Sequence, residues 1–536
     1  MKTYSREQFV KDVTAGIIVA IIALPLFIAL ALASGVGPEA GIFTAIVAGF
    51  VISALGGSGV QIAGPTAAFA TIVAGIVAKN GLDGLVIATI LAGIFLILMG
   101  LCHFGTLIRF IPYTITTGFT AGIAVTIVIG QLKDFFGVTY PDGVKPIETM
   151  EKLHAFVENC GTVNLSAVIV GVVSLAILII SPYIFKKIPG SLLAVVAGIL
   201  MVKFLPLKAS TIGDLYSISN ALPGFHLPAL SLAAVKDAIP NAFTIAVLAA
   251  IESLLSCVVA DGMINGKHRS DMELVAQGAG NIASALFGGI PATGAIARTA
   301  ANIKNGGRTP IAGMVHSITL VLVLVVLMPY AGMIPMPTIA AILFVVAYNM
   351  CQWRPFAHLI QTAPKSDILV LLVTFFLTVV FDLVVAIEIG MLLTCLLFMK
   401  RMSDETHVDS WTYVDDDSDA VNDHMQKLAK EIRVFEITGP LFFGAANAIE
   451  HIVVKDFTKC LVLRMRSVPA LDSTAMNALQ NLVKYCEAKG ITPIFSHVNE
   501  QPMHVMEKAG FVELVGKDNF CANISDALKR AEELIK

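Results

Sequence analysis

Apolar segments fill the chain up to Arg401, and most of them are close to the length that crosses a lipid bilayer. A spanning helix needs about 20 predominantly apolar residues, and in lipid every backbone N–H and C=O group must be satisfied within the protein. Of the 536 residues, 56% are hydrophobic and 14% are charged, against roughly 25% charged residues in soluble domains. The chain is therefore predicted to be a polytopic α-helical membrane protein whose first partner is the lipid bilayer.

Fourteen helical segments are predicted, and several are too short to span a bilayer alone. Their even number places both termini on the same side of the membrane. The segments lie at residues 12–34, 39–55, 65–78, 84–101, 112–132, 164–181, 191–205, 240–260, 271–288, 294–304, 309–328, 337–350, 366–381 and 383–400.

The basic residues indicate which side that is. With this assignment Arg6, Lys187, Arg308 and Arg401 fall on the side of the termini. The opposite side carries lysines mainly in two long loops, where basic residues have little influence on orientation. The positive-inside rule therefore predicts that both termini are cytosolic.

The composition changes after Arg401. An acidic stretch at residues 415–419 is followed by β-like runs that alternate with amphipathic helices. The predicted organisation is a transmembrane domain at residues 1–402, a linker at 403–430 and a cytosolic α/β domain at 431–536.

A weak internal repeat relates the third segment to the tenth. Ser53-Ala-Leu-Gly-Gly57 precedes Gly64-Pro-Thr-Ala-Ala-Phe-Ala70, and Ser284-Ala-Leu-Phe-Gly-Gly289 precedes Pro291-Ala-Thr-Gly-Ala-Ile-Ala-Arg298. Short hydrophobic segments broken by Gly and Pro at matching positions in two halves indicate a transporter's binding site near the bilayer midplane. Two inverted repeats of seven segments fit this pattern. The alternative is that small residues simply serve close helix packing.

An anion site is predicted between these two segments. Half-helices that begin near the midplane would direct their free N–H groups and positive dipole ends at each other. Arg298, a permanent cation in an apolar run, would add a full charge. The alternatives for Arg298 are a salt bridge to a neighbouring carboxylate or contact with cytoplasmic water. The predicted backbone donors are Thr66, Ala67, Ala68, Gly294, Ala295 and Ile296.

A coupling site is predicted at Glu252, an isolated carboxylate in the eighth segment, with Ser256 one turn away on the same face. A desolvated carboxylate can carry a proton near neutral pH or bind a hard cation with other oxygen ligands. The alternative is a static salt bridge to Arg298.

Three residues after or near Pro25 are predicted to form the apolar wall of the anion site, although such residues commonly face lipid or the core. They are Leu26, Phe27 and Leu30.

Several classes of function are disfavoured. The net charge of -3 and the lack of a basic tract argue against a nucleic-acid partner. Eight cysteines without a CxxC pair indicate neither a disulfide framework nor a metal site. The sequence has no P-loop, nucleophile–base pair or metal-ligand spacing. We therefore expect neither an enzyme nor a cofactor other than a coupling ion, H⁺ or Na⁺.

Three stretches resemble the sulfate permease (SulP) family of anion transporters: Gly64-Pro-Thr-Ala-Ala-Phe69, residues 251–262 and residues 287–302. The resemblance implies two inverted seven-segment repeats, a core domain that moves against a gate domain by alternating access, and a homodimer. It also implies a substrate among sulfate, bicarbonate, chloride, oxalate and C4-dicarboxylates.

The spelling of these motifs is most similar to bacterial proton-coupled C4-dicarboxylate carriers of the family, which implies a bacterial inner-membrane protein. In bicarbonate members thought to use sodium, the position of Glu252 tends to be Asp and that of Ile296 tends to be Thr. The resemblance therefore favours H⁺ over Na⁺.

The C-terminal domain resembles the STAS domain, on residues 432–444, 460–466 and 471–475. The resemblance implies a small sheet flanked by helices and a surface for a cytosolic partner protein. In soluble relatives the serine matching Ser473 is phosphorylated. A regulatory Ser473 is the hypothesis here, and a simple N-cap role for Asp472 or Ser473 is the alternative.

Three functions compete. The leading one is a cation-coupled secondary transporter of a small anion. The second is an uncoupled anion channel or an exchanger on the same scaffold. The third is a nucleobase carrier of similar topology, which Arg298 in the tenth segment disfavours.

Overall fold

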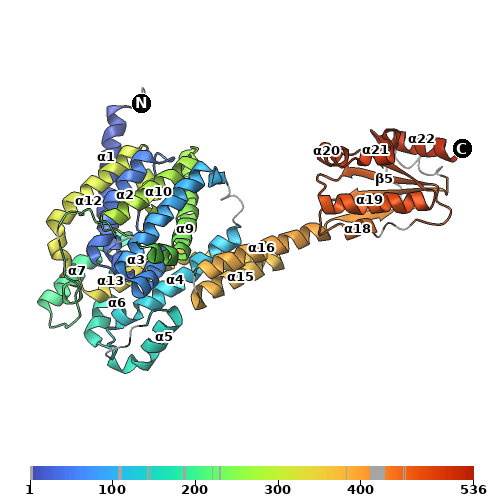
Figure 1. Ribbon diagram of the computed structural model, residues 1–536. Coiled ribbons are helices and arrows are strands. Elements are labelled where there is room, and N and C mark those ends of the chain that lie inside the picture. Colours follow the sequence, from blue (N-terminus) through green and yellow to red (C-terminus); the bar gives the residue numbers. More distant parts are fainter. Residues whose placement is uncertain are drawn as a thin grey trace. The chain divides into compact units, whose positions relative to one another are not determined.

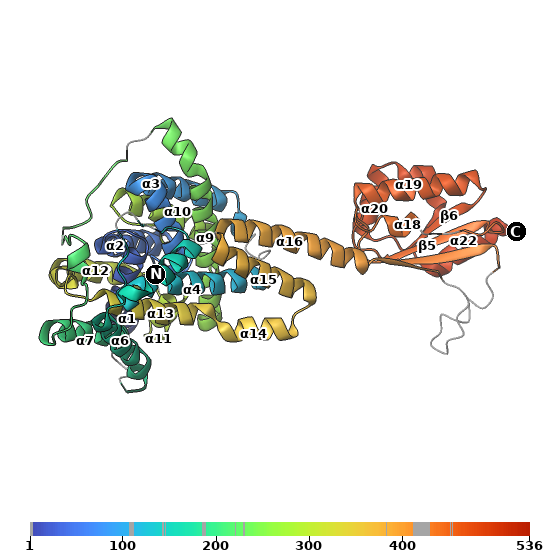
Figure 2. The same cartoon turned by 90° about the horizontal axis from the view of Figure 1, so that it is seen from below.

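The computed structural model of the chain divides into two compact units, residues 1–391 and 392–536 (Figures 1 and 2). Each unit is described by itself. The structure describes residues 4–106, 112–141, 144, 146–184, 189–219, 221–228, 231–381, 383–410, 429–450, 452 and 454–536.

The membrane unit is helical, and each of the fourteen predicted segments coincides with a helix or with one half of a helix. The helices that match predicted segments are α1 (Arg6–Ala33), α2 (Pro38–Leu55), α3 (Ala67–Leu101), α4 (Tyr113–Phe136), α6 (Leu165–Ile184), α7 (Gly190–Phe204), α9 (Leu232–Ile264), α10 (Ser270–Leu286), α11 (Ile296–Lys304), α12 (Pro310–Ala331), α13 (Met336–Cys351), α15 (Lys365–Val380) and α16 (Leu383–Asp404). Shorter helices between them are α5 (Thr149–Glu158), α8 (Ile212–Leu215) and α14 (Trp353–Thr362).

The third and fourth predicted segments are continuous in α3, with a break at Gly81. This glycine has φ 71° and ψ -174°, a conformation that residues with a side chain rarely adopt. Eight of the described helices are long and apolar enough to cross a membrane.

The helices of the membrane unit pack into two groups. In the first group α3 packs on α9 and α10, α2 on α10 and α12, and α1 on α12. In the second group α4 packs on α13 and α15, and α6 on α7 and α13. Each group draws helices from both halves of the chain, which is the arrangement expected of two inverted repeats.

Glycines allow the closest approach in the first group. A Cβ atom added to Gly93 of α3 would lie 2.6 Å from the carbonyl oxygen of Gly278, and one added to Gly278 of α10 would lie 2.4 Å from that of Gly93. The backbones of α3 and α10 therefore touch directly, as small residues permit between membrane helices.

Two short strands join the halves of the membrane unit. β1 (Ala63–Gly64) and β2 (Thr293–Gly294) pair antiparallel, with Ala63 opposite Gly294. α3 begins three residues after Gly64, and α11 begins two residues after Gly294. The third and tenth predicted segments thus start side by side.

The C-terminal unit is a five-stranded sheet in the order β3-β4-β5-β6-β7. β3 is antiparallel to β4, and the other neighbours are parallel. The strands are β3 (His407–Ser410), β4 (Ile432–Thr438), β5 (Cys460–Ser467), β6 (Thr492–Ser496) and β7 (Phe520–Cys521). The helices are α18 (Asn447–Glu450), α19 (Ser473–Ala488), α20 (Glu500–Lys508), α21 (Phe511–Val515) and α22 (Ile524–Ile535).

Alternating side chains of the central strands bury both faces of this sheet. Phe435 and Leu461 belong to the core beneath α19, α20 and α21, whereas Val434 and Val462 belong to the core beneath α22. This period of two is the pattern of a sheet covered by helices on both sides.

The linker expected at residues 403–430 requires a correction at its start. Residues 407–410 form the edge strand β3, which pairs with β4, and Val408 packs against the core. A four-residue strand separated from β4 by an acidic stretch has no periodic signal of its own in the sequence. The rest of the expected linker from 411 to 428 lies outside the described residues.

The N-cap of α19 is Asp472. Its carboxylate accepts hydrogen bonds from the N–H of Ala475 at 2.8 Å and of Phe443 at 2.9 Å. Ser473 is exposed at the next position. The capping role therefore falls to Asp472, and regulation through Ser473 stays a prediction.

Strand β3 should be needed for a stable C-terminal unit. A fragment of residues 405–536 should unfold at a Tm at least about 5 °C above that of a fragment of residues 431–536, because losing β3 exposes the β4 edge and costs about 1 kcal/mol or more. Circular dichroism during heating measures the difference. A fragment of residues 411–536 is the length control and should behave like the shorter one; equal Tm values for all three would contradict the role of β3.

Candidate functional site

The candidate site lies where the N-termini of α3 and α11 meet beside the β1–β2 pair. Thr66 is the N-cap of α3 and Ala295 the N-cap of α11, both with extended backbones and without a side-chain cap. The first N–H groups of a helix have no partner within it and carry a partial positive charge. The two helix N-termini predicted from the internal repeat therefore begin beside the same strand pair.

A buried polar face of α10 positions both strands. Its residues Glu273, Gln277, Asn281 and Ser284 are spaced by three or four, so they share one side of the helix, and each is 0% exposed. A polar stripe of this spacing is visible in the sequence of the ninth segment, but the sequence analysis did not single it out.

The carboxylate of Glu273 binds the loop that leads into β1. It accepts hydrogen bonds from the N–H groups of Gly57 at 2.8 Å and Ser58 at 3.1 Å. It also accepts from the side-chain amides of Gln61 at 2.7 Å and Gln277 at 2.9 Å. Four hydrogen-bond donors therefore satisfy this buried carboxylate.

The remainder of the polar face binds the loop that leads into β2. The amide of Asn281 exchanges two hydrogen bonds with the backbone of Ala292, at 2.8 and 2.9 Å. The hydroxyl of Ser284 donates to the carbonyl of Ile290 at 2.8 Å. One helix therefore fixes the approach to both half-helices.

Two of the predicted anion donors are already engaged. The N–H of Gly294 donates to the hydroxyl of Ser253 at 3.1 Å, and that of Ala295 donates to the carbonyl of Ile62 at 3.1 Å. The predicted donor set is corrected accordingly, and Ile296 is the remaining member on the α11 side. These bonds hold β2 against α9 and β1, which sequence spacing could not reveal.

Arg298 is buried at this junction with 5% of its surface exposed. Its Nη2 atom donates to the carbonyl of Pro65 at 2.8 Å. Its guanidinium carbon lies 4.9 Å from the centre of the Phe27 ring, a cation–π contact. The Nε and Nη1 atoms are buried and have no hydrogen-bond partner among the described residues.

The carboxylates of the described part of the chain do not approach Arg298 closely. No carboxylate oxygen of these residues lies within 4.0 Å of its nitrogen atoms, although Glu252 is near enough for an electrostatic interaction. Direct ion pairing and exposure to cytoplasmic water, the two alternatives for this residue, are not the arrangement seen.

Gly64 makes room for the guanidinium. A Cβ atom at this position would lie 2.5 Å from Nη1 of Arg298 and 3.5 Å from the ring of Phe27. The glycine that ends β1 is therefore required by the close approach of Arg298 from the other half of the chain.

Glu252 faces the N-terminus of α3. The hydroxyl of Thr66 donates to its carboxylate at 2.8 Å. Ser256, predicted to act with Glu252, is buried and donates instead to the hydroxyl of Thr299 at 3.4 Å. The structure thus joins Glu252 to the α3 side of the site and Ser256 to the α11 side.

The predicted apolar residues have different environments. Phe27 stacks on Arg298 and is itself contacted edge to face by the ring of His316 at 5.9 Å. On the same helix Leu30 is buried and Leu26 half-buried. Elsewhere in the site, Ala67 and Ala68 are buried, whereas Ile296 is 42% exposed.

Comparison with known proteins identifies both units. Residues 9–374 match the sulfate permease family and residues 426–527 the STAS domain. The chain is 39% identical to "Putative sulfate transporter YvdB" of Bacillus subtilis (strain 168), over 97% of each chain. It is 31% identical to the bicarbonate transporter BicA of Picosynechococcus, over 97% of this chain and 94% of the relative. The named relatives are transporters rather than enzymes.

Solved structures share the fold. The murine Slc26a9 anion transporter superimposes with a TM-score of 0.88 at 18% identity, over 99% of this chain and 93% of that one. The transmembrane domain of a cyanobacterial BicA superimposes with a TM-score of 0.65 at 29% identity, over 72% of this chain and 98% of that one. The predicted helical membrane fold with a C-terminal STAS domain is confirmed.

Removal of the Glu273 carboxylate should destabilise the membrane unit. In Glu273→Ala the donors of Gly57, Ser58 and Gln61 lose their acceptor, at about 1–3 kcal/mol each, so the apparent Tm in detergent should fall by at least about 5 °C. Scanning fluorimetry measures it. Asp237→Ala, which removes an exposed carboxylate of α9, is the control, and an equal Tm for both variants would contradict the role of Glu273.

Proposed function

Because the chain belongs to the sulfate permease family of anion transporters, we propose that it is a cation-coupled secondary transporter that binds its anion between the N-termini of α3 and α11. The named relatives make sulfate and bicarbonate the first substrates to test. A C4-dicarboxylate, which the residues of the motifs favour, is the third substrate to test.

The main support for the proposal is that Arg298 has buried N–H donors without a hydrogen-bond acceptor among the described residues. A guanidinium cannot be relieved by deprotonation, and an unsatisfied buried donor costs about 1–3 kcal/mol. Here Nε and Nη1 are buried without a partner among the described residues, while Pro65 and Phe27 hold the group in place. An oxyanion or carboxylate would accept hydrogen bonds from both nitrogens.

The helix N-termini support the same ligand. Ala67 and Ala68 begin α3, and Ile296 begins α11. Each helix N-terminus contributes the equivalent of roughly half a positive charge, and the small side chains of the alanines permit a close approach to the backbone. The anion is bound by these N–H groups and oriented by the guanidinium.

Glu252 is the proposed proton carrier. An anion that binds beside an ionised carboxylate is repelled by it, so anion binding and protonation of Glu252 favour each other, and linkage makes the effect reciprocal. Sodium coupling would need further oxygen ligands, and the hydroxyl of Ser256 is directed to Thr299. This arrangement favours H⁺ over Na⁺.

Transport by alternating access is proposed to move the first helix group against the second. The whole anion site, on α1, α3, α9 and α11, belongs to the first group, which is the core. The second group, with α4, α6, α7, α13 and α15, is the gate. We place the protein as a homodimer in the bacterial inner membrane, with both termini cytosolic and the STAS domain available to a cytosolic partner.

Arg298→Ala should abolish anion binding and uptake. Losing a buried, hydrogen-bonded charge costs about 2–5 kcal/mol, so the Kd for sulfate should rise by at least about 30-fold. Arg298→Lys should restore little, because an ammonium lacks the planar donor fork. Uptake of labelled sulfate and bicarbonate into proteoliposomes measures the effect.

The control for this variant is Lys304→Ala, which removes an exposed cation from the same helix. It should transport as the parent protein does. Full uptake by Arg298→Ala would refute the assignment of the anion site.

Glu252→Gln should separate anion movement from the proton gradient. In the parent protein, uptake should rise as the external pH falls, because protonation of Glu252 favours anion binding. The variant should lose this dependence and the ability to accumulate anion, while downhill exchange persists. Glu388→Gln, at an exposed carboxylate of α16, is the control.

The outcomes of this experiment separate the competing functions. An unchanged pH dependence in Glu252→Gln would show that another group carries the proton. If anion accumulation by the parent protein does not depend on the proton gradient, the protein would instead be a channel or an exchanger.

A further inference from the structure

The membrane unit contains a cleft of about 390 Å³ that is separate from the contacts around Arg298. Its lining draws on both helix groups, with residues of α3 and α9 from the first and of α4 and α15 from the second, and it also includes residues of α5 and α16. Lysine and asparagine side chains take part in the lining, among them Lys79, Asn80, Lys152 and Asn241.

On α3 the cleft continues the row of residues that starts at the anion site. Thr71, Gly75 and Lys79 line it at spacings of four, on one side of the helix. Thr71 is four residues beyond Ala67, the first residue of α3, which is about 6 Å at 1.5 Å per residue. The cleft therefore begins about one helical turn from the site.

On α9 the cleft also lies on the side of the anion site. Asn241 lines it and precedes Glu252 by eleven residues, about three turns, so the two share a face of α9. α3 and α9 pack against each other, and the hydrogen bond from Thr66 to Glu252 joins them at the site. Both helices place the cleft on the same approach to the site.

The cleft carries two ammonium groups that are not neutralised by contact. Among the described residues, no carboxylate lies within 4.0 Å of Lys79 or Lys152. Glu148 is the carboxylate that shares the lining. Lys79 is exposed, and burial lowers the pKa of the half-buried Lys152.

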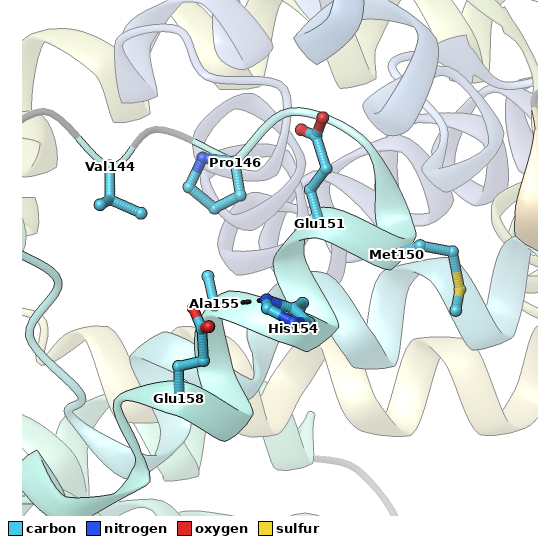
Figure 3. A pocket seen from close by; sticks show the side chains of 7 residues that line it. All are labelled: Val144, Pro146, Met150, Glu151, His154, Ala155 and Glu158. Atoms are coloured by element: carbon cyan, nitrogen blue, oxygen red, sulfur yellow. Dashed lines mark ion pairs between the residues drawn. The ribbon is translucent and has the colours of Figure 1, made fainter.

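Glu151 belongs to a different hollow on α5 (Figure 3). It lines that hollow together with His154 and Glu158, which form an ion pair at 3.3 Å. Its carboxylate accepts hydrogen bonds from the N–H groups of Ile147 and Glu148. These hydrogen bonds, and after them the attraction of Lys79 and Lys152, lower the pKa of Glu151, and among the described residues its carboxylate makes no contact within 4.0 Å with either lysine.

We propose that this cleft is an anion vestibule, in which Lys79 and Lys152 collect a small oxyanion or carboxylate and release it along α3 to the site at Arg298. The proposal rests on the proposed function and adds a second, weaker binding region to it. Glu148 reduces the attraction, so the anion is concentrated without being retained. The orientation predicted from the basic residues places the vestibule on the extracellular side.

Charge-selective labelling tests the vestibule without a substrate. Asn241→Cys is made in a variant whose three exposed cysteines, Cys102, Cys160 and Cys395, are replaced by serine. Intact cells are treated with a membrane-impermeant anionic methanethiosulfonate reagent or with its cationic counterpart, and each rate is divided by the rate with a free thiol. The anionic reagent should react faster, and Lys79→Gln with Lys152→Gln should lower the ratio of the two rates by about fivefold or more.

Two further variants serve as controls for the labelling experiment. Lys236→Gln, at an exposed lysine of α9 outside the lining, should leave the ratio unchanged. Arg298→Ala should also leave it unchanged, because the vestibule lysines act independently of the deeper site. A ratio insensitive to Lys79 and Lys152, or an introduced thiol in Asn241→Cys that reacts only from the cytosolic side, would overturn the proposal.

Transport kinetics provide the functional test. With labelled sulfate at an ionic strength of about 20 mM, the double lysine-to-glutamine variant should have a KM about 3- to 10-fold higher with kcat retained. The difference should shrink at about 300 mM, where charges are screened, and lysine-to-arginine replacements should restore the KM. A KM that does not change, or a loss confined to kcat, would overturn the vestibule.

The outcomes distinguish this proposal from the proposed function. If Arg298→Ala transports normally while the two lysines still control the labelling ratio, the anion site is wrongly assigned and the vestibule stands. If Arg298→Ala is inactive and the lysines have no effect on either measurement, the site stands and the vestibule is refuted.

Discussion

The pairing of β1 with β2 is the contact on which the membrane unit depends, because it places two helix N-termini from opposite halves of the chain next to each other. Two residues per strand cannot hold such a junction. The buried side chains of Glu273 and Asn281 supply the missing bonds by binding the loops that lead into each strand. α10, which contributes no residue to the proposed anion site, therefore determines the geometry of that site.

Buried charge in this unit is handled in two ways. The carboxylate of Glu273 accepts hydrogen bonds from four donors, so its role is structural. Arg298 is only partly compensated, by one carbonyl, one aromatic ring and the nearby carboxylate of Glu252, which does not contact it. Since desolvated charges normally have their bonding capacity filled, the contrast separates a residue that builds the fold from one whose unpaired donors suit the proposed anion.

The predictions of the helices and of the site residues rested on hydropathy and on the few charged residues within apolar segments. The helical segments were visible because a run of about 20 apolar residues can satisfy all its backbone groups in lipid as a helix, and Arg298 and Glu252 stood out as isolated charges. The engagement of the Gly294 and Ala295 N–H groups, the turn of Ser256 toward Thr299 and the strand at 407–410 could not be predicted. Each depends on contacts with partners remote from it in sequence, which no local pattern encodes.

The backbone contact between Gly93 and Gly278 has a consequence for how the molecule can work. At this contact no side chain separates the backbones of α3 and α10, so the two helices cannot slide past each other there without a clash. In the proposed movement of the first helix group against the second, α3 and α10 would therefore move together as one rigid body. The proposed anion site would then present the same donors to either compartment, and the gradients across the membrane would set the direction of net transport.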